Sequence, residues 1–248
     1  MILTIRKVLI LTIALFSLSL PGLGAPFLFN TGVDDDGDPL PYAASTSDLH
    51  WTITSSPYGA IDAVLADPGA FPISTGQWIA NSATTSWIGP ANQPTGGPAG
   101  AATGGPNGSN IFGTYVYETV FDLSTFFLNT VSLSGSYAVD NRVTDIRVNG
   151  ASIGAVGAGS FSALTNFNIP AGGSLFNSGN NTLTFVTQNG VGPGDDEFGP
   201  TGLYAQFTLS GIQVPELDAA SATVPLTLLV GAFLILVDRR RKGSSTLA

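Results

Sequence analysis

Apolar residues form continuous runs near the two ends of the chain and short, interrupted runs between them. Residues 8–20 read VLILTIALFSLSL, and residues 219–237 read AASATVPLTLLVGAFLILV without one charged side chain. In the middle of the chain, Leu183 and Phe185 alternate with threonines, which is the period of a strand that buries one face. The pattern predicts a β-rich domain between two apolar segments.

The central segment predicts many short strands joined by turns. Runs rich in Val, Ile, Phe and Tyr are bounded by Gly, Pro, Ser, Thr and Asn, as in all-β domains. Asn149-Gly150 is a dipeptide favoured in two-residue type I′ hairpins. No amphipathic helix is indicated before the C-terminal apolar run. Strands are expected at residues 50–54, 78–81, 85–88, 114–122, 130–139, 143–148, 181–188 and 203–212.

Residues 89–110 interrupt this pattern, because they read GPANQPTGGPAGAATGGPNGSN and carry no charge. So many Gly and Pro residues prevent regular structure and predict an exposed loop. The loop is either an insertion that the strands tolerate or a flexible segment that grips a ligand.

The N-terminal run has the features of a secretory signal peptide. Arg6 and Lys7 precede it, and Gly22 and Gly24 supply a small-x-small cleavage site just after it. An uncleaved anchor is the alternative, but the run is shorter than the ~20 residues that a membrane span needs. We therefore expect residues 1–24 to be the signal peptide, with cleavage after Gly24 or, alternatively, after Ala25.

The C-terminal run, residues 219–237, is long enough to cross a bilayer as a helix. A basic cluster follows it directly: Arg239, Arg240, Arg241 and Lys242. Because clustered cations beside a span stay on the cytoplasmic side, everything before the span is expected outside the inner membrane. A buried core helix would not explain such a cluster.

Three features in order, namely Val214-Pro215-Glu216-Leu217, the apolar run and the basic cluster, resemble the PEP-CTERM sorting signal of exported bacterial proteins. The resemblance covers residues 214–242, and Leu217 stands where that family has its second proline. It implies an exosortase as processing partner, cleavage near Pro215-Glu216, and release to the cell surface or the medium. It also implies an association with exopolysaccharide.

Charge limits the partners of the central domain, residues 25–213. This segment carries 14 acidic side chains and only two basic ones, Arg142 and Arg147, a net charge of −12. Nucleic-acid binding needs clustered Lys and Arg, so we exclude nucleic acid as a partner. Anionic polymers are repelled unless a divalent cation bridges them, whereas neutral sugars, cations and proteins remain open. The chain has no cysteine, which excludes thiol chemistry.

Residues 115–212 resemble galactose-binding-like jelly rolls. The resemblance rests on YETVFDLS, SGSYAVDNRVTDIRVNG and FNIPAGGSLFNSGNNTLTFVTQN in that order. It implies a β-sandwich of the kind that accompanies glycoside hydrolases as a sugar-binding domain. Such sandwiches carry many unrelated ligands, so the resemblance bears on the fold more than on the ligand.

Candidate site residues are few. Carboxylates crowd at Asp34, Asp36 and Asp38, which suggests calcium, although the EF-hand register fails. A second acidic cluster, 195–197, has the same ambiguity. Trp51 could stack on a sugar ring and Arg142 could contact a polar ligand, while Trp78 and Trp87 suit a core.

No catalytic or cofactor-binding residue stands out. His50, the one histidine, has no nucleophile motif and no second histidine to share a metal with, so we expect it to be structural. We interpret the chain as a non-enzymatic surface or matrix protein. A carbohydrate-binding module with a defined glycan pocket is the alternative, and a glycoside hydrolase is a weaker third.

Overall fold

The computed structural model describes residues 28–43, 46–91, 106–108, 110–154, 156–190 and 198–214. The predicted signal peptide, the apolar run 219–237 and the basic cluster 239–242 lie outside these residues. No helix within the described ranges has the length and hydropathy of a membrane span.

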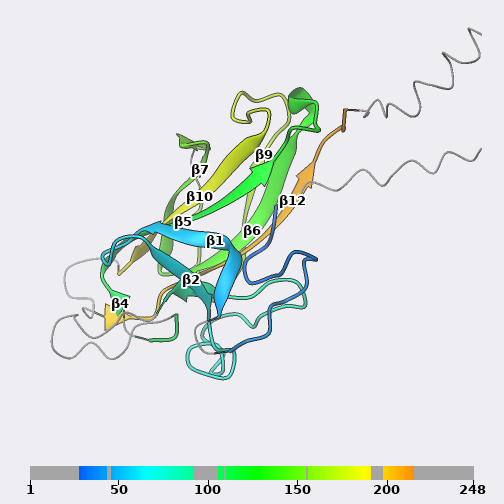
Figure 1. The fold of residues 1–248 in the computed structure, drawn as a ribbon. Helices are drawn as coiled ribbons and strands as arrows, with labels where there is room; N and C mark the ends of the chain where they lie inside the picture. The colour runs from blue at the N-terminus through cyan, green and yellow to red at the C-terminus, as the bar shows by residue number, and fades with distance from the viewer. Residues whose placement is uncertain are drawn as a thin grey trace, which may run out of the picture.

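The described chain is all-β. One antiparallel sheet has ten strands in the order β8-β7-β10-β5-β1-β2-β3-β12-β6-β9, and a second sheet pairs β11 with β4 (Figure 1). The single short helix in these residues, η1, is a 3₁₀ turn at Leu128–Thr130. The strands are β1 Ser47–Ser55, β2 Ile61–Leu65, β3 Ile88–Pro90, β4 Asn110–Ile111, β5 Gly113–Asp122, β6 Ser132–Asp140, β7 Arg142–Val148, β8 Ala151–Ser152, β9 Thr165–Ile169, β10 Asn180–Asn189, β11 Phe198–Gly199 and β12 Gly202–Ser210.

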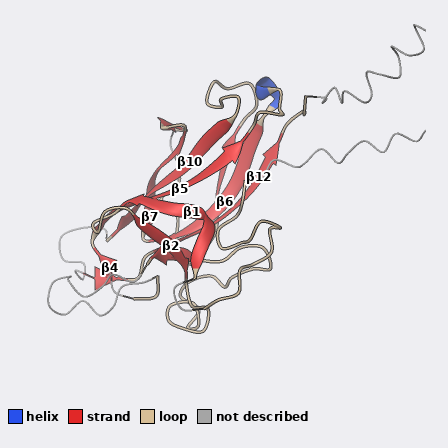
Figure 2. Ribbon diagram, viewed as in Figure 1, coloured by secondary structure: helices blue, strands red, loops and turns tan. Residues whose placement is uncertain are grey.

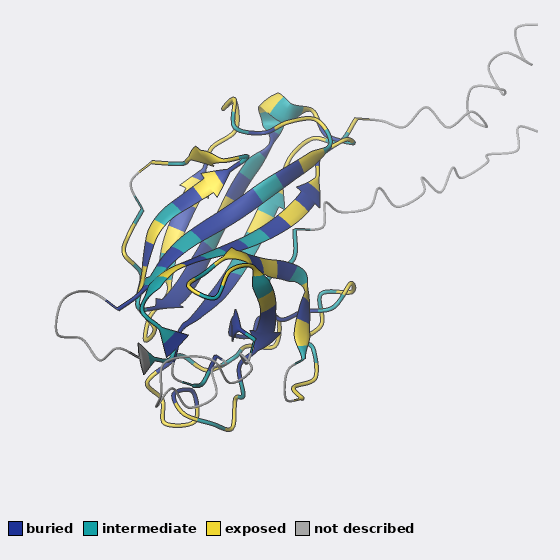
Figure 3. Cartoon of the chain, turned by 60° about the vertical axis from the view of Figure 1, so that its left-hand side comes forward, coloured by how far each residue is buried: buried dark blue, intermediate teal, exposed yellow. Residues whose placement is uncertain are grey.

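The large sheet curls so that strands distant in the strand order face each other across the core. The Tyr137 ring in β6 and the Phe185 ring in β10 meet edge to face, with centroids 5.5 Å apart. β10 also pairs with β5 without a break from Asn180↔Asp122 to Asn189↔Gly113. Successive side chains of a strand point to opposite faces. Buried and exposed residues accordingly alternate along the strands, as the bands in Figure 3 show.

A smaller apolar cluster lies on the outer face of the sheet. Trp78 and Trp87 stack with ring centroids 4.2 Å apart, and they pack with Ala138 of β6 and Tyr204 of β12. The segment between β2 and β3 thus covers one part of β6 and β12. The apolar residues at 78–81 serve this contact, so the strand predicted there is wrong, and the strand predicted at 85–88 begins only at Ile88.

The remaining predicted strands are confirmed within a few residues by β1, β5, β6, β7, β10 and β12. The turn is confirmed as well, because Asn149 and Gly150 have φ of 52° and 78° between the paired strands β7 and β8. The sequence did not predict β2 or β9. Of the predicted loop 89–110, β3 takes Gly89 and Pro90 and β4 takes Asn110, while residues 92–105 and 109 lie outside the described part.

Candidate functional site

A polar groove lies on the outer face of β6, β9 and β12. The strand registers align two rows of side chains, Gln206–Ser136–Asn166 and Thr208–Ser134–Asn168. Residues that alternate with them along the strands, including Leu133, Tyr137 and Phe167, belong to the core cluster. Because side chains alternate along a strand, the two rows point away from the core.

The groove has a volume of about 450 Å³ and no charged side chain in its lining. Hydroxyl and amide groups dominate it, and they offer hydrogen-bond donors as well as acceptors. The Gln206 side-chain amide donates to the Ser136 hydroxyl across the strands, at 2.8 Å. The lining residues are Asn30, Thr84, Ser134, Gly135, Ser136, Asn166, Phe167, Gln206, Phe207 and Thr208.

One wall of the groove comes from the segment before β1. Asn30 accepts a hydrogen bond from the Phe207 amide at 2.8 Å and donates one to the Thr84 carbonyl at 3.0 Å. The Thr31 amide donates to the Ala205 carbonyl at 3.0 Å. β3 reaches β12 only at Leu203↔Ile88, and beyond that pair this segment, which is not itself a strand, bonds to β12.

A second hollow of about 190 Å³ adjoins the groove and shares Asn30 and Phe207 with it. Phe29 and Asp36 also line this hollow, so a carboxylate is available only beyond the uncharged groove. The two hollows form one surface, with neutral groups over the sheet and an acidic end at the turn that contains Asp36.

These groove residues are not predicted from the sequence. A signal for them exists, because SLSGS, TNFNI and QFTLS each place small polar residues at every second position. That pattern predicts one polar face per strand. It does not reveal that the three faces lie side by side, since β6, β9 and β12 are far apart in the chain.

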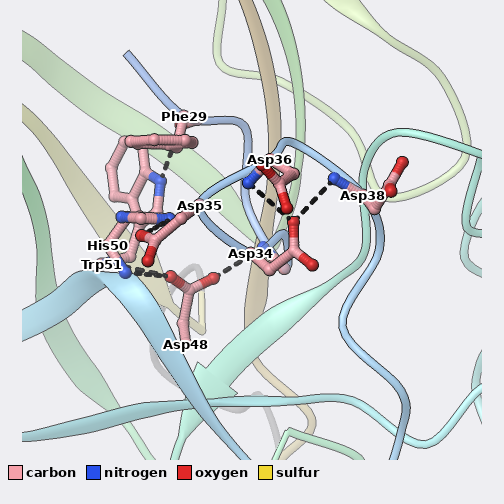
Figure 4. A network of polar contacts seen from close by, with 9 residues as sticks. Phe29, Asp34, Asp35, Asp36, Asp38, Asp48, His50 and Trp51 are labelled. Atoms are coloured by element: carbon pink, nitrogen blue, oxygen red, sulfur yellow. Dashed lines mark hydrogen bonds and ion pairs between the residues drawn. The ribbon is translucent and has the colours of Figure 1, made fainter. Parts of the chain in front are cut away.

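A polar network ties the segment before β1 to that strand (Figure 4). Asp48 accepts hydrogen bonds from the backbone amides of Gly32, His50 and Trp51, at 2.6, 2.8 and 2.9 Å. Burial raises the pKa of Asp48, and these three hydrogen bonds oppose that rise. The carboxylate thus holds two chain segments together, which is a structural role.

The single histidine belongs to the same network. The His50 ring stacks on Phe29 with centroids 3.5 Å apart, and its Nε2 lies 3.7 Å from the Asp35 carboxylate. The Trp51 indole N–H donates to the Phe29 carbonyl at 3.1 Å. These contacts position His50 as part of the packing between the segment and β1, as expected from the sequence.

The acidic turn at 34–38 uses its first carboxylate internally. Asp34 accepts hydrogen bonds from the backbone amides of Asp36 and Asp38, both at 3.0 Å, and Val33 forms a bridge with Pro39. Asp36 and Asp38 are exposed. Within the described residues no group of three or more His, Cys, Asp or Glu side chains could hold a metal ion. Calcium binding stays a prediction without an assembled ligand set, and residues 195–197 lie outside the described part.

The predicted glycan contacts are not brought together. Trp51 is only 1% exposed, so its ring cannot stack on a sugar, and this prediction is wrong. The reason is visible in β1, where Trp51 and Ile53 alternate with threonines and face the core. Arg142 is exposed at the start of β7, and β5 and β10 lie between β7 and β1 in the sheet.

The second arginine of the central domain and the predicted sorting tail remain to be placed in the structure. Arg147 pairs with Asp145 at 2.7 Å. Val214, the first residue of the predicted sorting motif, donates its amide hydrogen to the Thr125 carbonyl at 2.7 Å. The rest of the motif, Pro215, Glu216 and Leu217, lies outside the described residues, as do Arg239, Arg240, Arg241 and Lys242.

No protein-family model and no curated protein matches this chain. A solved structure to which it is similar is described as the structure of a family 35 carbohydrate binding module from an environmental isolate. The sequences are 11% identical, the match covers 54% of this chain and 97% of that one, and the TM-score is 0.27. A likeness of that size leaves the ligand of this chain to be argued from its own residues.

Proposed function

We propose that this chain is an exported, non-enzymatic envelope protein that associates with neutral polysaccharide through the groove over β6, β9 and β12. The observation that carries the proposal is the lining of that groove, in which amide and hydroxyl side chains of three strands stand in two rows without a charge. Concave sites with a few converging polar groups are where ligands bind.

A neutral glycan suits this lining for two reasons. Each sugar hydroxyl both donates and accepts hydrogen bonds, and so do Ser, Thr, Asn and Gln side chains taken together. The central domain carries a net charge of −12, so an anionic chain would be repelled over the whole surface and would find no cation in the groove. The curled antiparallel sheet is, in this proposal, a jelly roll of the galactose-binding type.

Export and sorting complete the proposal. The signal peptide 1–24 would direct the chain outward, the run 219–237 would hold it in the inner membrane, and an exosortase would cleave near Pro215-Glu216. Support comes from the order of motif, apolar run and basic cluster in the sequence.

The glycan part is tested with the full chain and a panel of neutral and anionic polysaccharides in affinity electrophoresis. We expect retardation by at least one neutral polymer. Gln206→Ala and Asn166→Ala should each weaken it about tenfold, the equivalent of about 1.4 kcal/mol. Gln188→Ala on β10 is the matched control, since Gln188 lies outside the groove lining. Unchanged binding by both groove variants would show that the ligand lies elsewhere.

The sorting part is tested by the intact mass of the protein from its native host, separated into membrane and medium. A mature chain that begins near Ala25 and ends near Glu216, outside the inner membrane, is the expected result. A chain that still ends at Ala248 in the membrane fraction would make the apolar run a permanent anchor and would remove exosortase processing from the proposal.

A further inference from the structure

Exposed apolar side chains gather at the end of the sheet towards which β12 points. Phe127 is 44% exposed, Ile212 62% and Val214 37%. Phe127 directly precedes η1, whereas Ile212 and Val214 follow β12. Figure 2 shows η1 in blue at the end of the sheet towards which β12 points. We call these three side chains the apolar rim.

The backbone beneath the apolar rim is held in place. The Phe127 amide donates to the Ile212 carbonyl at 2.9 Å, and the Val214 amide donates to the Thr125 carbonyl at 2.7 Å. The Ile212 amide donates to the Thr130 hydroxyl at 2.8 Å. Two loops are thereby fastened together, so the rim is a fixed surface and its exposure is a property of the folded domain.

The chain outside the described residues identifies what can cover this surface. The apolar run begins at residue 219, five residues after Val214. Five residues span at most about 18 Å when fully extended. If residues 219–237 cross the bilayer, the apolar rim therefore lies at or next to the headgroup region of that bilayer.

We propose that the apolar rim docks onto the lipid surface of the membrane that the C-terminal run enters. This inference rests on the membrane span in the proposed function, and it adds a second contact, made by the folded domain itself. Apolar side chains beside polar backbone are suited to the boundary between headgroups and acyl chains.

The charges near the apolar rim point to zwitterionic lipid. Asp122 begins the loop that leads to Phe127, and hydrogen bonds from Ser124 hold the pKa of Asp122 below its ordinary value. The two cations of the described residues are both in β7, and Arg147 is paired with Asp145. Among the described residues no cation lies beside the apolar rim, so the contact depends on insertion of the apolar side chains.

Because the chain has no cysteine, single labels can test the docking. The full chain carrying Ile212→Cys or Phe127→Cys is labelled with a nitroxide and reconstituted into phosphatidylcholine vesicles. Thr114→Cys is the control, because Thr114 is exposed at the opposite end of β5. Collisions with oxygen, which concentrates in lipid, are compared with collisions with a water-soluble nickel complex.

We expect the oxygen-to-nickel accessibility ratio to be several-fold higher at Ile212 and Phe127 than at Thr114. Equal ratios at all three positions, in protein that floats with the vesicles, would overturn the docking and leave the membrane span intact. Protein that does not float with the vesicles at all would overturn the span and the docking together. The two failures are therefore distinguishable in one preparation.

Discussion

The indole N–H of Trp78 donates a hydrogen bond to the Asp140 carboxylate, with 2.9 Å between the nitrogen and the oxygen. Asp140 is 7% exposed, and burial raises its pKa to about 6, although the Trp78 hydrogen bond favours the charged form. The phenol of Tyr117 is buried close by, and its pKa is raised by that burial and by the charge of Asp140. Tyr117 therefore stays neutral while Asp140 titrates.

Asp140 should make the fold less stable as the pH rises. Its pKa is higher in the folded state than the ordinary value of 3.8, so the folded state binds the proton more tightly. The contribution of protonated Asp140 to the unfolding free energy is complete below pH 3.8. It is lost as the pH rises through 6, and the total loss is about 3 kcal/mol. Urea unfolding at several pH values between 4 and 8 measures it. Asp140→Asn should flatten the profile, and an unchanged slope would contradict the assignment.

Removing the Asp48 carboxylate should destabilise the domain strongly. Asp48→Ala leaves three backbone amides without an acceptor, those of Gly32, His50 and Trp51. Unsatisfied buried donors cost about 1–3 kcal/mol each, so we expect at least 3 kcal/mol of lost unfolding free energy by tryptophan fluorescence. Asp36→Ala removes an exposed carboxylate on the neighbouring turn. It should change the unfolding free energy by about 0.5 kcal/mol or less. Equal effects would refute the role of Asp48.

The hairpin between β7 and β8 depends on the conformation of Gly150. Its φ is +78°, and a methyl group added there would meet no atom within 4 Å. Gly150→Ala therefore measures backbone strain alone and should lower the unfolding free energy by about 1 kcal/mol. Gly173→Ala is the matched control, since Gly173 does not have a left-handed φ and an added methyl group would meet only the Pro170 carbonyl oxygen, at 3.9 Å. Differential scanning calorimetry of the two variants decides, and equal melting temperatures would contradict the strain.

The Phe185 ring joins the two facing parts of the sheet. It lies within ring-contact distance of Trp51, Tyr137, Phe167 and Phe207. Phe185→Ala should cost about 3–5 kcal/mol in unfolding free energy, as for large cavities in cores. Phe161→Ala, which truncates a ring that is 37% exposed, should cost much less. A small effect at Phe185 would mean that the two parts of the sheet do not depend on this contact.

Strands with long, strict alternation are predictable from the sequence, as β5 and β10 demonstrate. Shorter ones are not, because β2 and β9 have only five residues each, and five residues carry little periodicity. Residues 78–81 show the opposite error, because a strand is predicted where none forms. Trp78 and Ile79 are apolar because they pack on the outer face of the sheet. Their backbone amides do not join a strand ladder, since Trp78 donates to the Pro72 carbonyl and Ile79 to the Phe161 carbonyl.

The candidate site was harder to predict than the fold. A single strand shows that Ser134 and Ser136 share a face, but only the register shows that Gln206 and Asn166 flank Ser136 on either side. Trp51 misleads for a related reason. An aromatic ring suits a sugar as well as a core, and the alternation of Trp51 and Ile53 with threonines is the signal that favours the core.

The position of β12 in the sheet determines when the core can close during synthesis. β12 lies between β3 and β6, and Thr31 bonds to Ala205 across 174 residues. The sheet therefore cannot close until synthesis has passed residue 210, almost at the predicted sorting motif. Such non-local pairing also folds slowly. If the chain is exported as proposed, export machinery that engages the N-terminal run during synthesis would meet a chain whose core has not yet formed, and no separate unfolding step would be needed.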